Sequence, residues 1–184
     1  MIGLLGGAFD PPHEGHLALA RAAITRFGLE RLLVLVVAEP GHRGVETPAE
    51  TRLRLAEAAF AGLAEVRLDE HGRTVDSLRA GAWDEPLFLI GADQFAEFLS
   101  WQEPDVVLDL ARLGVATRPG YPRERLDAVL ARLRRPDRVL FFDIEPLPVS
   151  STEVRERVAR GETIDGLVPA AVASLIAELG LYLS

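Results

Sequence analysis

Short apolar runs alternate with segments of helical periodicity along the whole chain. The clearest run, 32–38, is continuous and rich in valine, which is typical of a strand buried on both faces of a parallel sheet. Runs of the same kind predict strands at 2–5, 32–38, 65–68, 87–90, 113–117 and 139–142. Apolar positions at helical spacing predict helices at 16–27, 48 to about 61, 74–79, 104–110, 122–134, 152–160 and 169–179.

Strands that alternate with helices predict βαβ units. The expected fold class is therefore α/β, a Rossmann-like doubly wound, mostly parallel sheet with helices on both faces. Such sheets bind ligands beyond the carboxyl ends of their strands, near the point where the strand order reverses. We therefore expect the chemistry in the loops that follow the strands. No repeat, low-complexity segment or linker interrupts the pattern, so a single domain over 1–184 is expected.

Two helix starts carry capping signals. Thr47 and Glu50 form a capping-box pattern with Pro48 at the first helical position. Ser150 and Glu153 form a second such pattern near the C-terminus. Both pairs are expected to satisfy backbone amides at the first turn of their helices.

Composition narrows the protein class. The 184 residues are 48% hydrophobic, enough for a core that stands alone. The longest apolar run is too short to cross a bilayer, and the N-terminus has no basic leader. Cysteine and lysine are absent, which excludes disulfides, thiolate chemistry, a P-loop lysine and a lysyl nucleophile. A cytoplasmic protein with no membrane partner is expected.

The net charge of −8 disfavours nucleic acid as a partner, because the surface as a whole should repel polyanions. If the chain binds phosphate groups, it must do so with a local pocket.

The segment from Gly6 to His16 reads GGAFDPPHEGH and follows the first predicted strand directly. Paired glycines allow the backbone to approach a ligand closely. The Asp-Pro-Pro turn is stiff and fixes the direction of His13. His16 lies at a helix N-terminus, where backbone amides and the helix dipole favour an anion. Two imidazole donors and a helix end are thus predicted to converge on one phosphate.

Each part of this segment has a simpler interpretation. A Gly-Gly pair after a strand is commonly an ordinary turn, and a histidine at a helix start is commonly a cap. The His-x-x-His spacing also allows a zinc site, although it lies in a Pro/Gly turn with no evident third ligand.

The complete string resembles G-G-x-F-D-P-x-H-x-G-H, the signature of bacterial nicotinate-nucleotide adenylyltransferases within the HxGH nucleotidyltransferase superfamily. Phosphopantetheine adenylyltransferase carries a similar string, so this motif alone indicates the superfamily. The resemblance runs from Ile2 to Tyr182 and implies one nucleotidyltransferase domain over 1–184. It assigns catalysis to His13 and His16. It also implies that Asp10 contacts nicotinate mononucleotide and that the following residues of the loop contact ATP: Gly6, Gly7, Ala8, Phe9, His13 and His16.

A second phosphate site is predicted at 149–155. Arg155 has no acidic residue at helical spacing, and a cation in the first turns opposes the helix dipole. An unpaired arginine beside hydroxyl groups indicates a polyphosphate site. The segment is similar to the family motif I-S-[AS]-T-x-x-R, which implies triphosphate contacts by Ser150, Ser151, Thr152 and Arg155.

Three further segments resemble family motifs. Gly91 and Asp93 follow a predicted strand, where a carboxylate can accept from ribose hydroxyls, and match a motif that holds adenosine. Trp101 and Gln102 match a segment whose indole stacks on the pyridine ring. Arg118 lies in a turn similar to the family's R-R-P-G-Y/F and is assigned to nicotinate mononucleotide.

Two segments depart from the family pattern. The loop after the second strand is shortened, and His42 and Arg43 are carried over from it as phosphate contacts. Thr74 is carried over as a contact to nicotinate mononucleotide, but its neighbour Arg73 replaces the family's usual tyrosine. His71 is left unassigned.

The resemblance implies transfer of AMP from ATP to nicotinate mononucleotide, giving nicotinate adenine dinucleotide and pyrophosphate in NAD biosynthesis, with Mg²⁺ bound to ATP. The rivals are phosphopantetheine or nicotinamide mononucleotide as acceptor, and a non-catalytic nucleotide sensor of the same fold.

Overall fold

The computed structural model describes residues 1–40, 45 and 47–183. Its strands form one six-stranded, all-parallel sheet in the order β3-β2-β1-β4-β5-β6. The strands are β1 (Ile2–Gly7), β2 (Arg31–Val37), β3 (Glu65–Asp69), β4 (Leu87–Gly91), β5 (Arg112–Thr117) and β6 (Val139–Asp143). All the predicted strands are confirmed, and so is the doubly wound fold class.

The helices are α1 (Glu14–Phe27), α2 (Ala49–Ala59), α3 (Thr74–Gly81), α4 (Ala92–Ala96), α5 (Pro104–Leu110), α6 (Arg123–Leu130), α7 (Ser151–Ala159) and α8 (Ala170–Glu178). Short 3-10 turns lie at Phe98–Ser100 and Pro136–Arg138. The sequence did not predict α4, since five residues are too few to show a helical period. Helix α6 ends at Leu130, four residues before its predicted end.

The two capping predictions had different outcomes. The Ser150 hydroxyl accepts from the Glu153 amide at 3.1 Å and caps α7 as expected. The capping box at Thr47 was wrong, because Pro48 is itself the N-cap of α2 and no side chain caps this helix.

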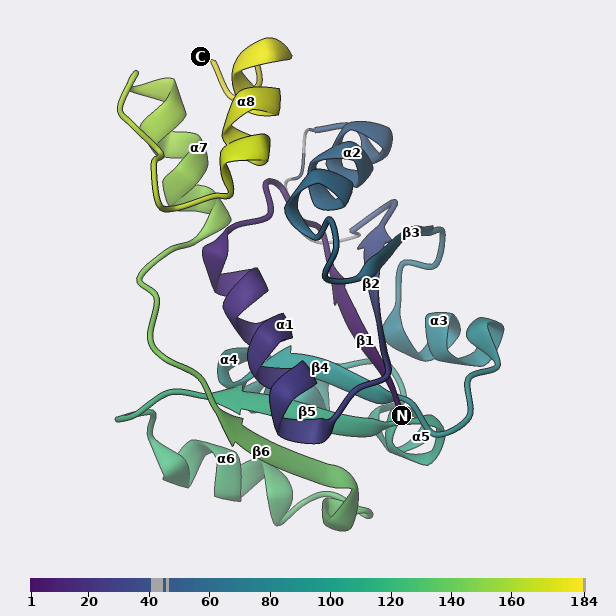
Figure 1. The fold of residues 1–184 in the computed structure, drawn as a ribbon. Coiled ribbons are helices and arrows are strands. Elements are labelled where there is room, and N and C mark those ends of the chain that lie inside the picture. The colour runs from purple at the N-terminus through teal and green to yellow at the C-terminus, as the bar shows by residue number, and fades with distance from the viewer. Residues whose placement is uncertain (41–44, 46, 184) are drawn as a thin grey trace.

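Helices cover both faces of the sheet (Figure 1). Neighbouring strand residues point to opposite sides, so that Leu5 and Val34 pack with α1, α2, α7 and α8. Leu4 and Leu33 pack with α3, α4, α5 and α6 on the other side. Both sets are almost completely buried. This explains why the central strands β2 and β4 are apolar without alternation.

The strand order reverses between β1 and β4, which pair in parallel with Leu5 opposite Leu89. Both strands end on glycine, at Gly7 and Gly91. The turn after β1 leads into α1, and the C-terminal helices α7 and α8 stand beside this turn (Figure 1). The carboxyl edge at the switch point is thus where segments from both ends of the chain meet.

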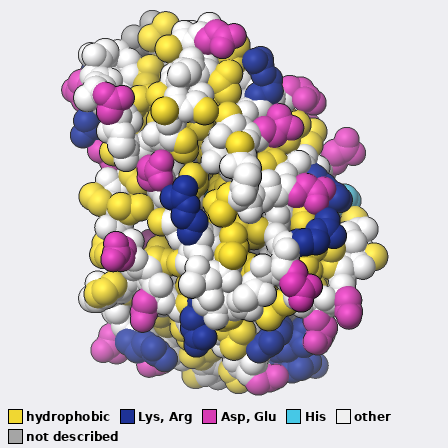
Figure 2. Space-filling view, in the orientation of Figure 1, with side chains coloured by type: hydrophobic (Ala, Val, Ile, Leu, Met, Phe, Trp, Pro, Cys, Tyr) yellow, Lys and Arg dark blue, Asp and Glu magenta, His cyan; other side chains and the backbone are white. Residues whose placement is uncertain are grey.

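The surface carries both signs of charge. On the face drawn in Figure 2, acidic and basic side chains are interspersed with apolar ones, and the coloured residues form no continuous basic surface. Within the described part of the chain, no helix combines the length and apolar character that crossing a membrane requires.

A matched pair of glycines tests the packing of the sheet. A methyl group at Gly114 on β5 would lie 2.7 Å from Leu89 Cδ2, whereas one at Gly91 would meet nothing within 4 Å. We expect Gly114→Ala to lower the free energy of unfolding by about 1–3 kcal/mol through overpacking, and Gly91→Ala to change it far less. Urea unfolding of both variants measures the difference, and equal losses would contradict this packing.

Candidate active site

A buried arginine fixes the loop that follows β1. The Arg52 side chain, on α2, is 1% exposed and donates to four backbone carbonyls. They belong to Ala8, Val37 and Ala38, each at 2.8 Å, and to Thr47 at 3.0 Å. One guanidinium thus joins the loop after β1, the end of β2 and the start of α2.

Sequence reasoning missed Arg52, although a signal was present. Its position belongs to the buried face of α2, three, four and seven residues before Leu55, Ala56 and Ala59. An arginine at an apolar position of a helix marks a buried cation that must find several acceptors.

Asp10 is also buried, with 5% of its surface exposed. Its carboxylate accepts a hydrogen bond of 2.7 Å from the Tyr182 hydroxyl, near the end of the chain. Burial, together with the adjacent carboxylate, raises the pKa of Tyr182 well above its usual range. Asp10 Oδ1 thus ties the C-terminal end of the chain to the loop, and the contact between Asp10 and nicotinate mononucleotide stays a prediction.

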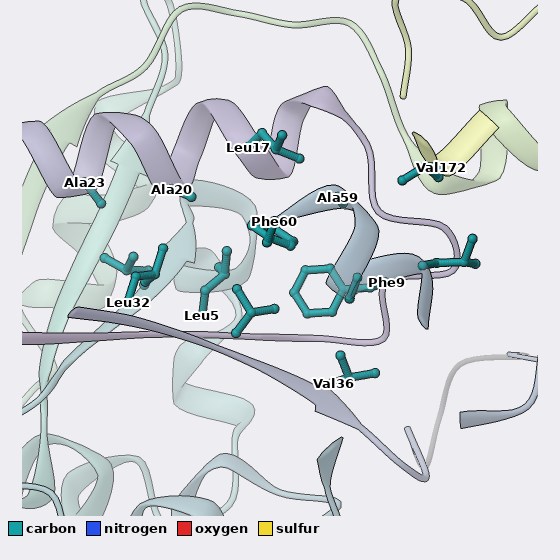
Figure 3. Packing of buried hydrophobic residues seen from close by; sticks show 14 of the residues in the cluster. Leu5, Phe9, Leu17, Ala20, Ala23, Leu32, Val36, Ala59, Phe60 and Val172 are labelled. Carbon is teal, nitrogen blue, oxygen red and sulfur yellow. The ribbon is translucent and has the colours of Figure 1, made fainter. Parts of the chain in front are cut away.

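The Phe9 side chain belongs to the core. It is 2% exposed, and its ring lies 5.8 Å from that of Phe60 (Figure 3). The His16 imidazole lies 5.0 Å from the same ring. A methyl group at Gly7 would lie 3.1 Å from this ring, so a larger residue there would require the ring to shift. The contact of Phe9 with ATP stays a prediction, and with the ring in the core it would have to be made by the backbone.

The two histidines of the motif stack on each other. Their ring centroids lie 3.7 Å apart with 28° between the planes. The backbone N–H of His13 donates to His16 Nδ1 at 3.2 Å, which places the proton of the neutral His16 ring on Nε2. A Cβ atom added at Gly15 would lie 3.0 Å from the His13 ring, which accounts for the glycine between the histidines.

Burial lowers the pKa of His13 to about 4, from the usual value of 6.5 for histidine. The Nδ1 atom of this ring is buried and has no hydrogen-bond partner in the described chain. At neutral pH the ring is therefore uncharged. It can offer an N–H to a phosphate oxygen but does not act as a resident cation.

The N-terminus of α1 is partly occupied by the protein itself. The Glu14 amide donates to the Leu167 carbonyl at 2.9 Å, and the His16 amide donates to the His13 carbonyl at 2.9 Å. The predicted contribution of free helix amides to a phosphate site is thus smaller than the sequence indicated.

Two hydrogen bonds join the late helix α7 to the loop after β1. Ser151 Oγ donates to the Pro11 carbonyl at 2.8 Å, and Arg155 donates to the Asp10 carbonyl at 2.7 Å. Arg155 also donates to Thr152 Oγ1 at 3.3 Å. The expectation that this arginine is unpaired was therefore wrong. A guanidinium has several N–H donors, and these bonds orient the group without using all of them. The two segments predicted to bind phosphates lie together.

A pocket of about 810 Å³ opens beside the loop. The site residues predicted from sequence that line it are Gly6, Gly7, Ala8, Thr74, Trp101 and Gln102. The Trp101 indole packs edgewise on Phe88, at 6.4 Å, and on Phe98, at 5.3 Å. These aromatic neighbours hold the indole in place at the wall of the pocket.

The residues assigned to adenosine and to the turn after β5 lie at the same edge of the sheet. The Gly91 amide donates to Gln94 Oε1 at 3.1 Å. Asp93 is exposed and accepts from the Tyr121 hydroxyl at 3.1 Å. Arg118, three residues before Tyr121, is exposed. Asp93 is thereby joined to the turn that carries Arg118.

His42 and Arg43 lie outside the described residues. Over 1–40, 45 and 47–183, no group of three or more His, Cys, Asp or Glu side chains is placed to hold a metal ion.

Comparison with known proteins finds relatives that match almost the whole chain. The cytidylyltransferase-like family model matches residues 4–157. A protein named "Probable nicotinate-nucleotide adenylyltransferase" from Rubrobacter xylanophilus is 34% identical, with 98% of this chain and 91% of the relative covered. A protein of the same name from Thermus thermophilus is 36% identical, with 98% of each chain covered.

Solved structures show the same fold. Nicotinic acid mononucleotide adenylyltransferase of Plasmodium falciparum, complexed with NaAD, aligns with a TM-score of 0.77. The alignment covers 98% of this chain and 96% of that one, at 17% identity.

Replacement of Arg52 tests its role in holding the loop. Arg52→Met removes the donors of four buried carbonyls, and we expect the free energy of unfolding to fall by about 3 kcal/mol or more. Arg54 is exposed on the same helix, so Arg54→Met should change it by less than about 0.5 kcal/mol. Chemical denaturation of both variants checks this, and similar losses would contradict the role.

The lowered pKa of His13 predicts a pH-dependent stability. The unfolded chain takes up this proton near pH 6.5, whereas the folded protein resists it down to pH about 4. Stabilisation by the neutral ring is complete above pH 6.5 and is lost as the pH falls toward 4, by up to about 3 kcal/mol. Urea unfolding at several pH values should show a smaller loss for His13→Gln. An unchanged slope in that variant would show that His13 titrates normally.

Proposed function

We propose that this chain, which belongs to the nicotinate-nucleotide adenylyltransferase family of cytidylyltransferase-like proteins, transfers AMP from ATP to nicotinate mononucleotide. The products are nicotinate adenine dinucleotide and pyrophosphate, which places the enzyme in NAD biosynthesis. A cytoplasmic location remains a prediction from the sequence.

The observation that carries the proposal is the junction between the opening loop and α7. Ser151 and Arg155 bond to the carbonyls of Pro11 and Asp10, close to His13 and His16 in the chain. Imidazole, hydroxyl and guanidinium groups are thereby gathered beside the β1–β4 switch point, where nucleotides bind in doubly wound sheets.

In the proposed reaction the 5′-phosphate of the acceptor attacks the α-phosphorus of ATP in line. A new P–O bond forms there as the bond to the β-phosphate oxygen breaks, and pyrophosphate leaves with that electron pair. No protein nucleophile is required. Catalysis comes from positioning and from donors aimed at the developing negative charge.

The side chains of the loop and of α7 supply these donors. His16 Nε2–H and the neutral His13 ring donate to the α-phosphate and its neighbour as charge increases. Ser151, Thr152 and Arg155 hold the departing pyrophosphate, and the two hydrogen bonds of Arg155 within the protein orient its guanidinium beforehand.

Mg²⁺ bound with ATP would neutralise part of the charge on its phosphates and so assist the departure of pyrophosphate.

The acceptor is proposed to occupy the pocket that adjoins the loop. Trp101 presents an indole held by Phe88 and Phe98, a suitable surface for a planar pyridine ring. Gly6 and Gly7 line the same pocket, so an acceptor phosphate at its inner end lies next to the segment that leads to His13.

The direct test is pyrophosphate release from ATP with each of three acceptors, which are nicotinate mononucleotide, nicotinamide mononucleotide and phosphopantetheine. We expect release with nicotinate mononucleotide and much slower release with phosphopantetheine. Comparable rates with phosphopantetheine would defeat the acceptor assignment. If ATP binds but no pyrophosphate is released with any of the acceptors, the nucleotide sensor would be favoured.

Replacement of His16 tests the catalytic assignment. His16→Ala should lower kcat by about 10²–10⁴ if the imidazole donates in the transition state. The KM for ATP should change much less, because the interaction strengthens as charge develops. Steady-state kinetics with both substrates measures this, and a kcat close to that of the unmodified enzyme would remove His16 from the mechanism.

A further inference from the structure

Four ionisable side chains line the proposed acceptor pocket in the described chain: Asp69, His71, Arg73 and Glu97. Two of them satisfy each other. Asp69 accepts from both the backbone amide and the Nδ1 atom of His71 at 3.0 Å, and from Ser77 Oγ at 2.5 Å. The Asp69 carboxylate is therefore a fixed part of the wall.

Arg73 differs from these neighbours. Its side chain is exposed to the pocket, and no hydrogen bond or salt bridge joins its guanidinium to another described residue. Most other arginines on the surface have an acidic partner, as Arg79 does in Glu103. An unpaired guanidinium at the wall of a ligand pocket is a site prepared for an anionic group.

The position of Arg73 adds a second feature. It is the N-cap residue of α3, Thr74 follows it as the first helical residue, and no side chain caps this helix. Gly72, just before it, packs close to the Glu39 carbonyl, where an added methyl would lie at 3.4 Å. The turn that carries Arg73 is thus held against the chain that leaves β2.

We infer that Arg73 is a specificity-determining residue that makes the enzyme prefer the acid over the amide form of the mononucleotide. Its guanidinium pairs with the pyridine carboxylate while Trp101 holds the ring. This inference rests on the proposed function and adds a residue for which the family pattern offers no equivalent, since tyrosine is usual at this position.

The charge of the remaining wall explains why a cation matters here. Asp69 and Glu97 are both acidic, and without Arg73 they would repel a substrate carboxylate. A nicotinamide group is uncharged and would not experience this repulsion. Loss of Arg73 should therefore penalise the acid substrate selectively.

The alternative role for Arg73 is contact with the phosphate or ribose, which both mononucleotides share. In that case the loss of the guanidinium would weaken both substrates equally. The ratio of their kcat/KM values therefore separates carboxylate recognition from general binding.

The experiment compares kcat/KM for nicotinate and nicotinamide mononucleotides in three variants. Arg73→Gln should lower the acid-to-amide ratio about ten-fold, mainly through KM of the acid, as expected for one charge-assisted hydrogen bond in a partly exposed site. Arg73→Lys, which keeps the charge, should retain most of the ratio. Arg132→Gln, a matched loss of charge outside the pocket lining, should leave the ratio unchanged.

Calorimetric binding of each mononucleotide to the same variants gives a readout independent of turnover. An unchanged ratio in Arg73→Gln, or an equal loss for both mononucleotides, overturns the inference and leaves the proposed function intact. If the unmodified protein forms product with neither mononucleotide, the proposed function fails and this inference fails with it.

Discussion

The hydrogen bonds of Arg52 are the interaction on which the site depends. A loop that follows a buried strand exposes carbonyls that have no ladder partner, and leaving them unsatisfied in the interior is costly. Arg52 satisfies four such carbonyls from a position on the buried face of α2. One of these carbonyls, that of Ala8, belongs to the loop after β1, so Arg52 joins the start of this loop to the end of β2 and the start of α2.

The C-terminal part of the chain completes this arrangement. Tyr182 bonds to the Asp10 carboxylate, and Ser151 and Arg155 bond to the loop carbonyls. The loop after β1 is thus held both by α2 and by the C-terminal part of the chain. An enzyme that works mainly by positioning requires such rigidity, since small misplacements of donors reduce the rate sharply. The imidazole and guanidinium groups gathered at this junction allow a chain of net charge −8 to present a local site for the proposed polyphosphate.

Much of the fold was predictable because its signals are local. The valine-rich run of β2 is apolar on both faces, and the Asp-Pro-Pro turn marks the break between β1 and α1. Helix α4 was missed because it spans little more than one turn. The capping box at Thr47 failed because the adjacent proline took the N-cap position, a choice that residue types alone do not decide.

The site was predictable in its members more than in their roles. The pairing of the first loop with α7 followed from two phosphate-type motifs, but the bond partners of Asp10 and Phe9 depend on residues more than fifty positions away. Arg52 lies outside every motif, and only the folded chain brings Arg52 and Tyr182 to the loop.

A crystal structure with nicotinate adenine dinucleotide bound would test the central claim most directly. The account predicts the bridging phosphates between the histidine pair and the start of α7, with the pyridine ring against Trp101. A dinucleotide whose phosphates lie away from either segment would contradict it.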